Sequence, residues 1–339
     1  MKHEIEMYDH YVAVDWAKDN MAIARMTAKL NKITVLESPS DIGNLKAYLS
    51  QLQGSIVLTV EETTTAQWLY TELKNVVARL VICDPYRNRL LSEGPKTDKI
   101  DATKLVQLLK ANLLKEVYHT ADEFLYLRRI VSGYEDLVKA GVRLQNQRYS
   151  LLMASGTKST RGATLENPME QFVLARLDRQ IETYNQNKKE YESQFRIIGK
   201  KHKQILNLRT LPGIDWINAA KIVSQVVTPF RFSSKGDYLC YCGLVKLDRI
   251  SGGRSYGKKS PRYSRVLKEV YKMAAWSSIL HDGPLNDYYN QLITEKNYPE
   301  HQARHVLARR LAILSLGILR NGTKFDPKKR GADNELKSQ

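Results

Sequence analysis

The sequence has few cysteines and no long apolar segment. Its three cysteines, Cys83, Cys240 and Cys242, fit no disulfide framework and complete no zinc site. No apolar run approaches the roughly 20 residues that cross a bilayer. The hydrophilic start Met1–Glu4 does not lead into the apolar core of a signal peptide. We therefore expect reduced, structural cysteines and a cytoplasmic protein without a membrane partner.

Acidic residues are scarce relative to basic ones. The 339 residues include 53 Lys and Arg against 36 Asp and Glu, a formal net charge of +17. Such an excess is typical of proteins that bind polyanions. The basic residues concentrate around 249–265 and 324–330, which favours a nucleic-acid partner over a merely solvated basic surface.

The first third of the chain alternates short β-branched runs with helical patterns. The strand-like runs are 11–14, 21–25, 33–36, 56–60 and 80–83, with helices expected around 44–52, 67–77 and 102–111. Three early runs are close enough for hairpins, and the later ones are separated by helices. This order predicts a mixed five-stranded α/β sheet of the ribonuclease H kind.

Two long helical stretches follow between about residues 121 and 205, separated by a loop at 154–162. Both carry apolar residues in alternating steps of three and four, interrupted in the first stretch by Gly141 and Arg148. This pattern predicts an antiparallel coiled-coil hairpin. The interruptions suit a subunit contact as well as a hairpin within one chain.

After this hairpin, Leu211–Ile214 predicts a Pro-Gly turn between helices. Helix-hairpin-helix elements use such a turn to present backbone amides to phosphate, although most turns of this kind are only turns. We expect three domains, at 1–118, 119–206 and 207–339, the last mainly α-helical.

Four carboxylates stand at the ends of predicted elements. Asp15 and Glu61 each end a strand-like run, and Asp98 and Asp101 lie three residues apart where a helix should begin. Each has a structural explanation: Asp98 could cap the helix, Asp101 could complete a capping box, and Glu61 or Glu62 could be an ordinary charged strand end. Together they favour a site for a hard divalent cation beside a phosphate.

A second candidate site lies at 243–259, which is rich in glycine, hydroxyl groups and basic residues and is expected to be a loop. Glycines let backbone approach a phosphate closely, basic side chains neutralise it, and Ser251 could attack phosphorus. The alternative is a cationic DNA-contact loop without chemistry. We expect contacts to nucleic acid from the basic residues Arg249, Arg254, Lys258, Lys259 and Arg262.

These motifs resemble the insertion sequence 110 type transposases, which are bridge-RNA-guided recombinases, and the related Piv and MooV DNA invertases. The resemblance covers nearly the whole chain and rests on Val14–Asp15, Val60–Thr63, Lys96–Ala102, Leu211–Ile214, and Tyr241–Leu244 followed by Ser251–Gly252.

The resemblance implies an N-terminal RuvC-like domain in which Asp15, Glu61, Asp98 and Asp101 bind Mg²⁺ or Mn²⁺. It also implies a coiled-coil middle and a C-terminal transposase domain with Ser251 as the nucleophile. Strand exchange would proceed through a phosphoserine intermediate, guided by a non-coding bridge RNA that pairs with donor and target DNA. The assembly would be a homo-oligomer, from dimer to tetramer, acting at the nucleoid in prokaryotic cytoplasm.

Two competing hypotheses remain. One is a metal-dependent, RuvC-like nuclease for DNA junctions, in which Ser251 only contacts DNA. The other is a non-enzymatic nucleic-acid-binding protein on a degenerate scaffold.

Overall fold

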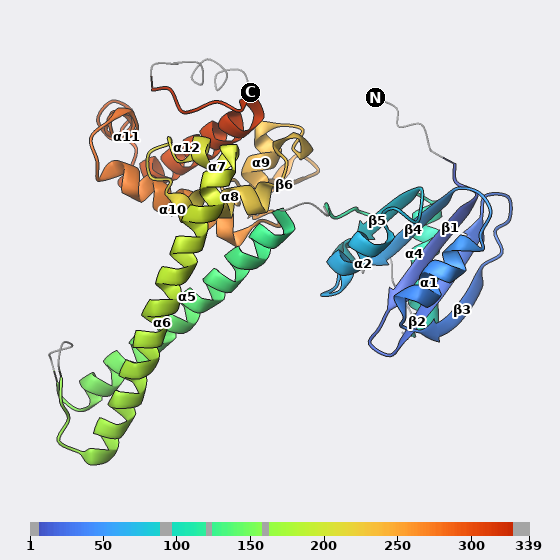
Figure 1. The fold of residues 1–339 in the computed structure, drawn as a ribbon. Helices are drawn as coiled ribbons and strands as arrows, with labels where there is room; N and C mark the ends of the chain where they lie inside the picture. Colours follow the sequence, from blue (N-terminus) through green and yellow to red (C-terminus); the bar gives the residue numbers. More distant parts are fainter. Residues whose placement is uncertain (1–6, 89–96, 120–123, 158–162, 328–339) are drawn as a thin grey trace. The chain divides into compact units, whose positions relative to one another are not determined.

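The computed structural model describes residues 7–88, 97–119, 124–157 and 163–327. The chain forms two compact units, Met1–Asp122 and Glu123–Gln339 (Figure 1). Lys96, residues 158–162 of the expected loop and residues 328–330 of the expected basic segment lie outside the described residues. All three cysteines lie within the described ranges, and none of them forms a disulfide there. None of the helices in the described ranges combines the length and apolarity needed to cross a bilayer.

The first unit is built on one five-stranded sheet in the order β3-β2-β1-β4-β5. Its strands are β1 (His10–Trp16), β2 (Asn20–Thr27), β3 (Thr34–Pro39), β4 (Ile56–Glu61) and β5 (Arg79–Cys83). The first three strands pair antiparallel, whereas β4 runs parallel to both β1 and β5. The expectation of a mixed five-stranded α/β sheet is confirmed.

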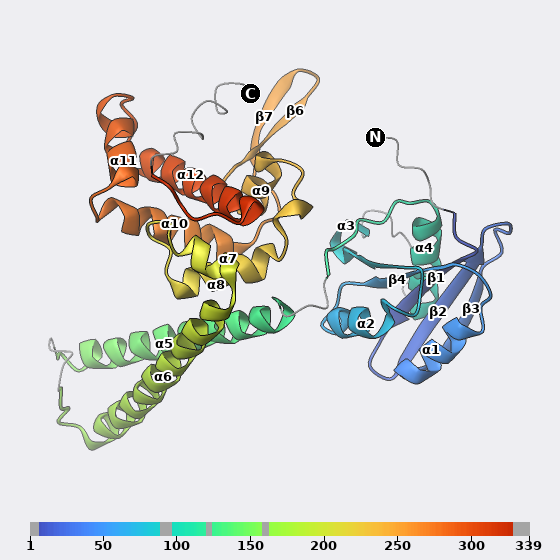
Figure 2. The same ribbon diagram turned by 45° about the horizontal axis from the view of Figure 1, so that its top comes forward.

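Helices cover both faces of this sheet (Figure 2). Alternation along β1 directs Val12 and Val14 toward α1 (Ile42–Ser50) and α2 (Ala66–Leu73). Tyr11 and Ala13 point the other way and pack with buried residues of α4 (Asp98–Lys110). A short helix, α3 (Pro85–Asn88), follows β5. Because side chains alternate between the two faces, the position of a residue along its strand determines which face of the sheet it lies on.

The second unit begins with the antiparallel pair α5 (Phe124–Ala154) and α6 (Pro168–Lys201), which lie side by side in Figures 1 and 2. Both interruptions of the apolar pattern have partners inside this pair. A Cβ on Gly141 would overlap the ring of Tyr184, so glycine makes room for that ring. Arg148 forms an ion pair with Asp178 of α6.

The rest of the second unit is mainly helical, as expected. Its helices are α7 (Lys203–Leu208), α8 (Trp216–Val226), the short 3₁₀ helix η2 (Pro229–Arg231), α9 (Lys235–Tyr241), α10 (Arg265–Ile279), α11 (Pro284–Thr294) and α12 (Glu300–Asn321). They share one apolar core, to which α12 contributes the fully buried Leu307 and Leu311. The Pro-Gly turn before α8 packs against α10, where Ser278 Oγ donates to the Pro212 carbonyl over 3.1 Å.

Candidate active site

Two parallel strands bring Asp15 and Glu61 to the same edge of the sheet. Val14 of β1 pairs with Val60 of β4, and the two acids are the next residues of their strands. Side chains alternate between faces along a strand, so both carboxylates lie on the face that α4 covers. Both are half-buried.

The start of α4 supplies the other two predicted acids. Thr97 is the N-cap, and its hydroxyl accepts a hydrogen bond from the Ile100 amide over 3.3 Å. This excludes the alternative in which Asp98 caps the helix, because the hydroxyl of the preceding residue takes that place. Asp98 and Asp101 lie in the first turn, where the helix dipole stabilises negative charge.

The four carboxylates share one electrostatic environment. The pKa of Asp15 is raised from 3.8 to about 6, first by burial and then by the charges of Asp98, Glu61 and Asp101. Among the described residues, no three or more Asp, Glu, His or Cys side chains are arranged as a formed metal site. The two observations agree, since repulsion between charges acts over longer distances than a metal–ligand bond. An all-oxygen set of mutually repelling carboxylates suits a hard divalent cation.

Glu62 takes the opposite face from Glu61. Its carboxylate accepts a hydrogen bond from Nε2 of the buried His119 over 2.5 Å, and Nδ1 of His119 lies 2.9 Å from Oε1 of Gln67 on α2. This pairing turns Glu62 away from the acidic cluster. His119 could not be predicted from the sequence, because a single histidine 57 residues from its partner belongs to no motif.

Ser251 lies on a β-hairpin, so the expectation of a loop at 243–259 is wrong. The strands β6 (Leu247–Ser251) and β7 (Arg254–Lys259) pair antiparallel, and Ser251 is opposite Arg254 next to the turn. The turn residues Gly252 and Gly253 have φ of +55° and +74°. Glycine accepts this conformation without the cost of a side chain, and two such residues make a tight hairpin turn.

The hairpin presents a basic, exposed surface. Every residue of β6 and β7 is exposed. Arg249 lies at an irregularity in the pairing, and Lys258 Nζ is 3.8 Å from Asp248 Oδ1. The hairpin brings together four of the predicted contacts to nucleic acid, Arg249, Arg254, Lys258 and Lys259, while Arg262 lies beyond it in the segment that leads to α10.

The base of the hairpin is fixed by the end of α9. Gly243, at φ +66°, follows the helix, and the amides of Gly243 and Leu244 return to the carbonyls of Cys240 and Leu239. A Cβ on Gly243 would lie 2.5 Å from the ring of Tyr263, on the other side of the hairpin. The Tyr-Cys-Gly-Leu motif therefore ends a helix and brings the two hairpin ends together.

Two family models match separate parts of this chain. The model of IS110-type DEDD transposases, described as "Transposase", matches residues 12–155, which contain all four carboxylates. The model described as "Transposase IS116/IS110/IS902 family" matches residues 206–290, which contain Ser251.

A curated relative is the "Insertion element IS116 uncharacterized 44.8 kDa protein" of Streptomyces clavuligerus. It is 29% identical over 121 residues, which are 35% of this chain and 30% of that protein. The match thus spans about a third of the relative's length. The two models together span more than half of the chain, and both describe transposases of one family. The chain belongs to the IS116/IS110/IS902 family of transposases.

Proposed function

We propose that this protein is a DNA recombinase that moves an insertion sequence by cutting and rejoining DNA. The observation that carries the proposal is the carboxylate cluster, in which burial and then the charges of Asp98, Glu61 and Asp101 raise the pKa of Asp15. Three antiparallel strands followed by two parallel ones support a RuvC-like, ribonuclease H kind of domain around this cluster. The family membership supports DNA as the substrate.

Asp15, Glu61, Asp98 and Asp101 are the residues that would hold Mg²⁺ or Mn²⁺. Bound there, the ion would stabilise negative charge that develops on a phosphate oxygen during substitution. Asp15 and Glu61 are fixed by the register of two paired strands, whereas Asp98 and Asp101 are fixed by the capped start of α4.

Ser251 is the proposed nucleophile. Its Oγ would form a bond to phosphorus while one phosphorus–oxygen bond of the DNA backbone breaks, and the serine proton would pass to the departing DNA oxygen. One phosphodiester bond replaces another, so the energy of the cleaved linkage is conserved in the serine ester. The same step in reverse with another DNA end therefore rejoins strands without an external energy source.

The basic hairpin would position the DNA backbone around Ser251. Arg254 is opposite Ser251 in the strand pairing, while Arg249, Lys258 and Lys259 extend the positive surface along both strands. Arg262 would add a contact beyond the hairpin. A bridge RNA would select the donor and target DNA, and several copies of the chain would assemble at the nucleoid.

A denaturant-resistant protein–DNA adduct tests this proposal. The purified chain is mixed with Mg²⁺, RNA transcribed from the element's flanking region and labelled DNA that carries the element junction. We expect an adduct with the wild type and none with Ser251→Ala or Asp98→Asn. Matched controls are Ser255→Ala, an exposed hydroxyl on β7, and Asp19→Asn, an exposed carboxylate between β1 and β2.

The controls should retain the adduct at the wild-type level. If DNA is cleaved without forming an adduct, and Ser251→Ala still cleaves it, the serine mechanism is contradicted and a metal-dependent nuclease remains. Binding without cleavage in the wild type, unchanged by Asp98→Asn, would instead favour the non-enzymatic alternative.

A further inference from the structure

A pocket of about 740 Å³ opens between α10 and α12 of the second unit. Its lining includes Lys272 and Trp276 of α10, and Arg304 and His305 of α12. Lys246, the residue directly before β6, also lines it. The pocket therefore adjoins the base of the hairpin that carries Ser251, and its volume is in the range of small-molecule sites.

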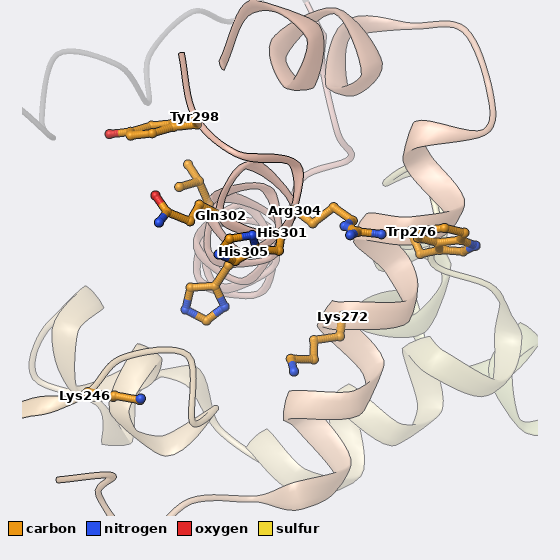
Figure 3. A pocket seen from close by; sticks show the side chains of 9 residues that line it. Lys246, Lys272, Trp276, Tyr298, His301, Gln302, Arg304 and His305 are labelled. Carbon is orange, nitrogen blue, oxygen red and sulfur yellow. The ribbon is translucent and has the colours of Figure 1, made fainter. Parts of the chain in front are cut away.

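The pocket is positively charged. Figure 3 shows Lys246 and Lys272 pointing toward one opening from opposite sides, with the His305 ring between them. None of the residues described as lining the pocket is acidic. The pKa of His305 is lowered, first by burial and then by the nearby cations Arg309, Lys272 and Lys268, although a hydrogen bond to the Leu244 backbone opposes the shift. Such a field favours an anionic ligand.

Aromatic rings stand beside these cations. Trp276 is 47% exposed and Tyr298 is 40% exposed, so both keep ring surface available to a ligand. The Arg304 guanidinium lies 5.2 Å from the centre of the Trp276 ring, which holds the indole next to a cation. Exposed aromatic faces beside cations are the features that stack and neutralise single-stranded nucleic acid.

A second hollow continues this surface along α10. It shares Lys272 with the pocket, and one acidic residue, Glu269, is among three cations in its lining. Tyr263 and Lys268 line it as well, and Lys268 Nζ lies 4.4 Å from the centre of the Tyr263 ring. Tyr263 is the residue that packs on Gly243 at the hairpin base. Cations and aromatic rings thus lie along the surface from the hairpin base into the pocket, as contacts to one strand would require.

We propose that this pocket binds an unpaired nucleotide of the DNA on which the enzyme acts. The base stacks on Trp276 or Tyr298, and Lys246, Lys272 and Arg304 pair with the flanking phosphates. A concave pocket admits a base only after it leaves the duplex stack, so the ligand is an unpaired nucleotide rather than intact duplex. The inference rests on the proposed function for the choice of DNA.

The test measures binding by the full-length chain in a Ser251→Ala background, where the proposed cutting cannot occur. One labelled DNA is a continuous duplex, and a second of equal length has a short central run of unpaired thymidines. Affinities are measured by fluorescence anisotropy at one ionic strength. The second DNA is called the gapped DNA. We expect at least one of the variants Trp276→Ala and Tyr298→Ala to bind the gapped DNA about 10-fold more weakly than the parent protein. Both variants should bind the continuous duplex with an affinity within about 2-fold of the parent protein.

Two matched controls separate the pocket from general effects. Tyr149→Ala removes an exposed tyrosine on α5, and Lys189→Gln removes an exposed lysine on α6. Neither should change the preference for gapped DNA. Lys272→Gln, which spares both rings, should reduce that preference and lower the salt dependence of gapped-DNA binding by about one phosphate contact.

Photocrosslinking locates the base. Iodouracil in the unpaired segment should crosslink to the peptides that contain Trp276 or Tyr298. Equal losses on gapped and duplex DNA, or crosslinks confined to peptides outside the pocket, would overturn the proposal. The proposal would also be overturned if an unpaired RNA strand bound more tightly than the unpaired DNA and Trp276→Ala weakened only RNA binding. If no adduct forms but the binding results are as expected, only the proposed recombination chemistry is contradicted.

Discussion

Nε2 of His119 donates a hydrogen bond to the Glu62 carboxylate over 2.5 Å, on the face of the sheet that α2 covers. Glu61, one residue earlier, lies on the face that α4 covers and adds to the repulsion at Asp15. The adjacent residues Glu61 and Glu62 therefore have different surroundings, and we expect only Glu61 to take part in the carboxylate cluster.

The pair Glu61 and Glu62 gives a matched comparison by amide substitution. Glu61→Gln should lower Mg²⁺-dependent DNA cleavage by about 100-fold or more, because it removes a carboxylate from the proposed metal site. Glu62→Gln should retain most of the cleavage rate, because its partner is His119. Initial cleavage rates at saturating Mg²⁺ measure both effects. The reverse order of the two variants would assign the cluster to Glu62.

Asp15→Asn should stabilise the metal-free protein at neutral pH. The folded-state pKa of Asp15, about 6, exceeds its ordinary 3.8, so the folded protein carries a cost for ionising this group. That cost is full above pH 6, shrinks as the pH falls toward 3.8 and vanishes below it. At a half-buried site we expect about 1–2 kcal/mol at pH 7.5, or a few degrees in melting temperature.

Thermal melts in EDTA at pH 7.5 and pH 4 measure this difference. The gain from Asp15→Asn should be present at the higher pH and mostly lost at the lower. Asp19→Asn, in the exposed turn between β1 and β2, should change neither value. Added Mg²⁺ should raise the melting temperature of the wild type more than that of Asp15→Asn. A destabilised Asp15→Asn at pH 7.5 would contradict the repulsion between these carboxylates.

Gly141→Ala should destabilise the α5–α6 pair although alanine favours helix. The intrinsic gain is about 1 kcal/mol, but the new Cβ overlaps the ring of Tyr184, and an overpacked contact costs about 1–3 kcal/mol. Gly317→Ala in α12 meets nothing within 4 Å and should stabilise by up to about 1 kcal/mol. Urea unfolding compares the two variants. A stabilised Gly141→Ala would mean that Tyr184 does not pack there.

Gly243→Ala should loosen the base of the hairpin. It combines a left-handed conformation, φ +66°, with a Cβ 2.5 Å from the Tyr263 ring. Gly322→Ala has nearly the same conformation, φ +64°, but open space around the new Cβ. Conformation alone costs each variant about 1–2 kcal/mol. Urea unfolding should show the greater loss for Gly243→Ala, and only that variant should reduce adduct formation by Ser251. Equal losses would exclude a packing role for Tyr263.

The α/β part of the fold was predictable because its signals are local. Short β-branched runs with breakers between them mark strands, and the order of hairpins and helices limits the sheet topology. The face on which each acid lies was not predictable, because it depends on register and on the helix that covers each face. Threonine and aspartate both cap helices, and the extended backbone of Thr97 in the structure shows that this residue, not Asp98, is the N-cap.

The hairpin β6–β7 was predicted as a loop for a different reason. All its residues are exposed, so no alternation of apolar residues marks its strands. Gly252 and Gly253 make the turn possible, but a glycine pair alone also fits a flexible loop. The pocket beside Trp276 could not be predicted either, since its lining comes from three separate segments of the chain.

Peptide mapping of the protein–DNA adduct shows whether Ser251 is joined to DNA in a step that needs the carboxylates. Trypsin cleavage after Arg249 and Arg254 releases residues 250–254, in which Ser251 carries the only hydroxyl side chain; Ser255 and Tyr256 fall in the next peptide. Mass spectrometry of the digested wild-type adduct should find the nucleotide on residues 250–254, and Asp98→Asn should give no such peptide. A nucleotide on another peptide, or an adduct that persists in Asp98→Asn, would contradict the claim.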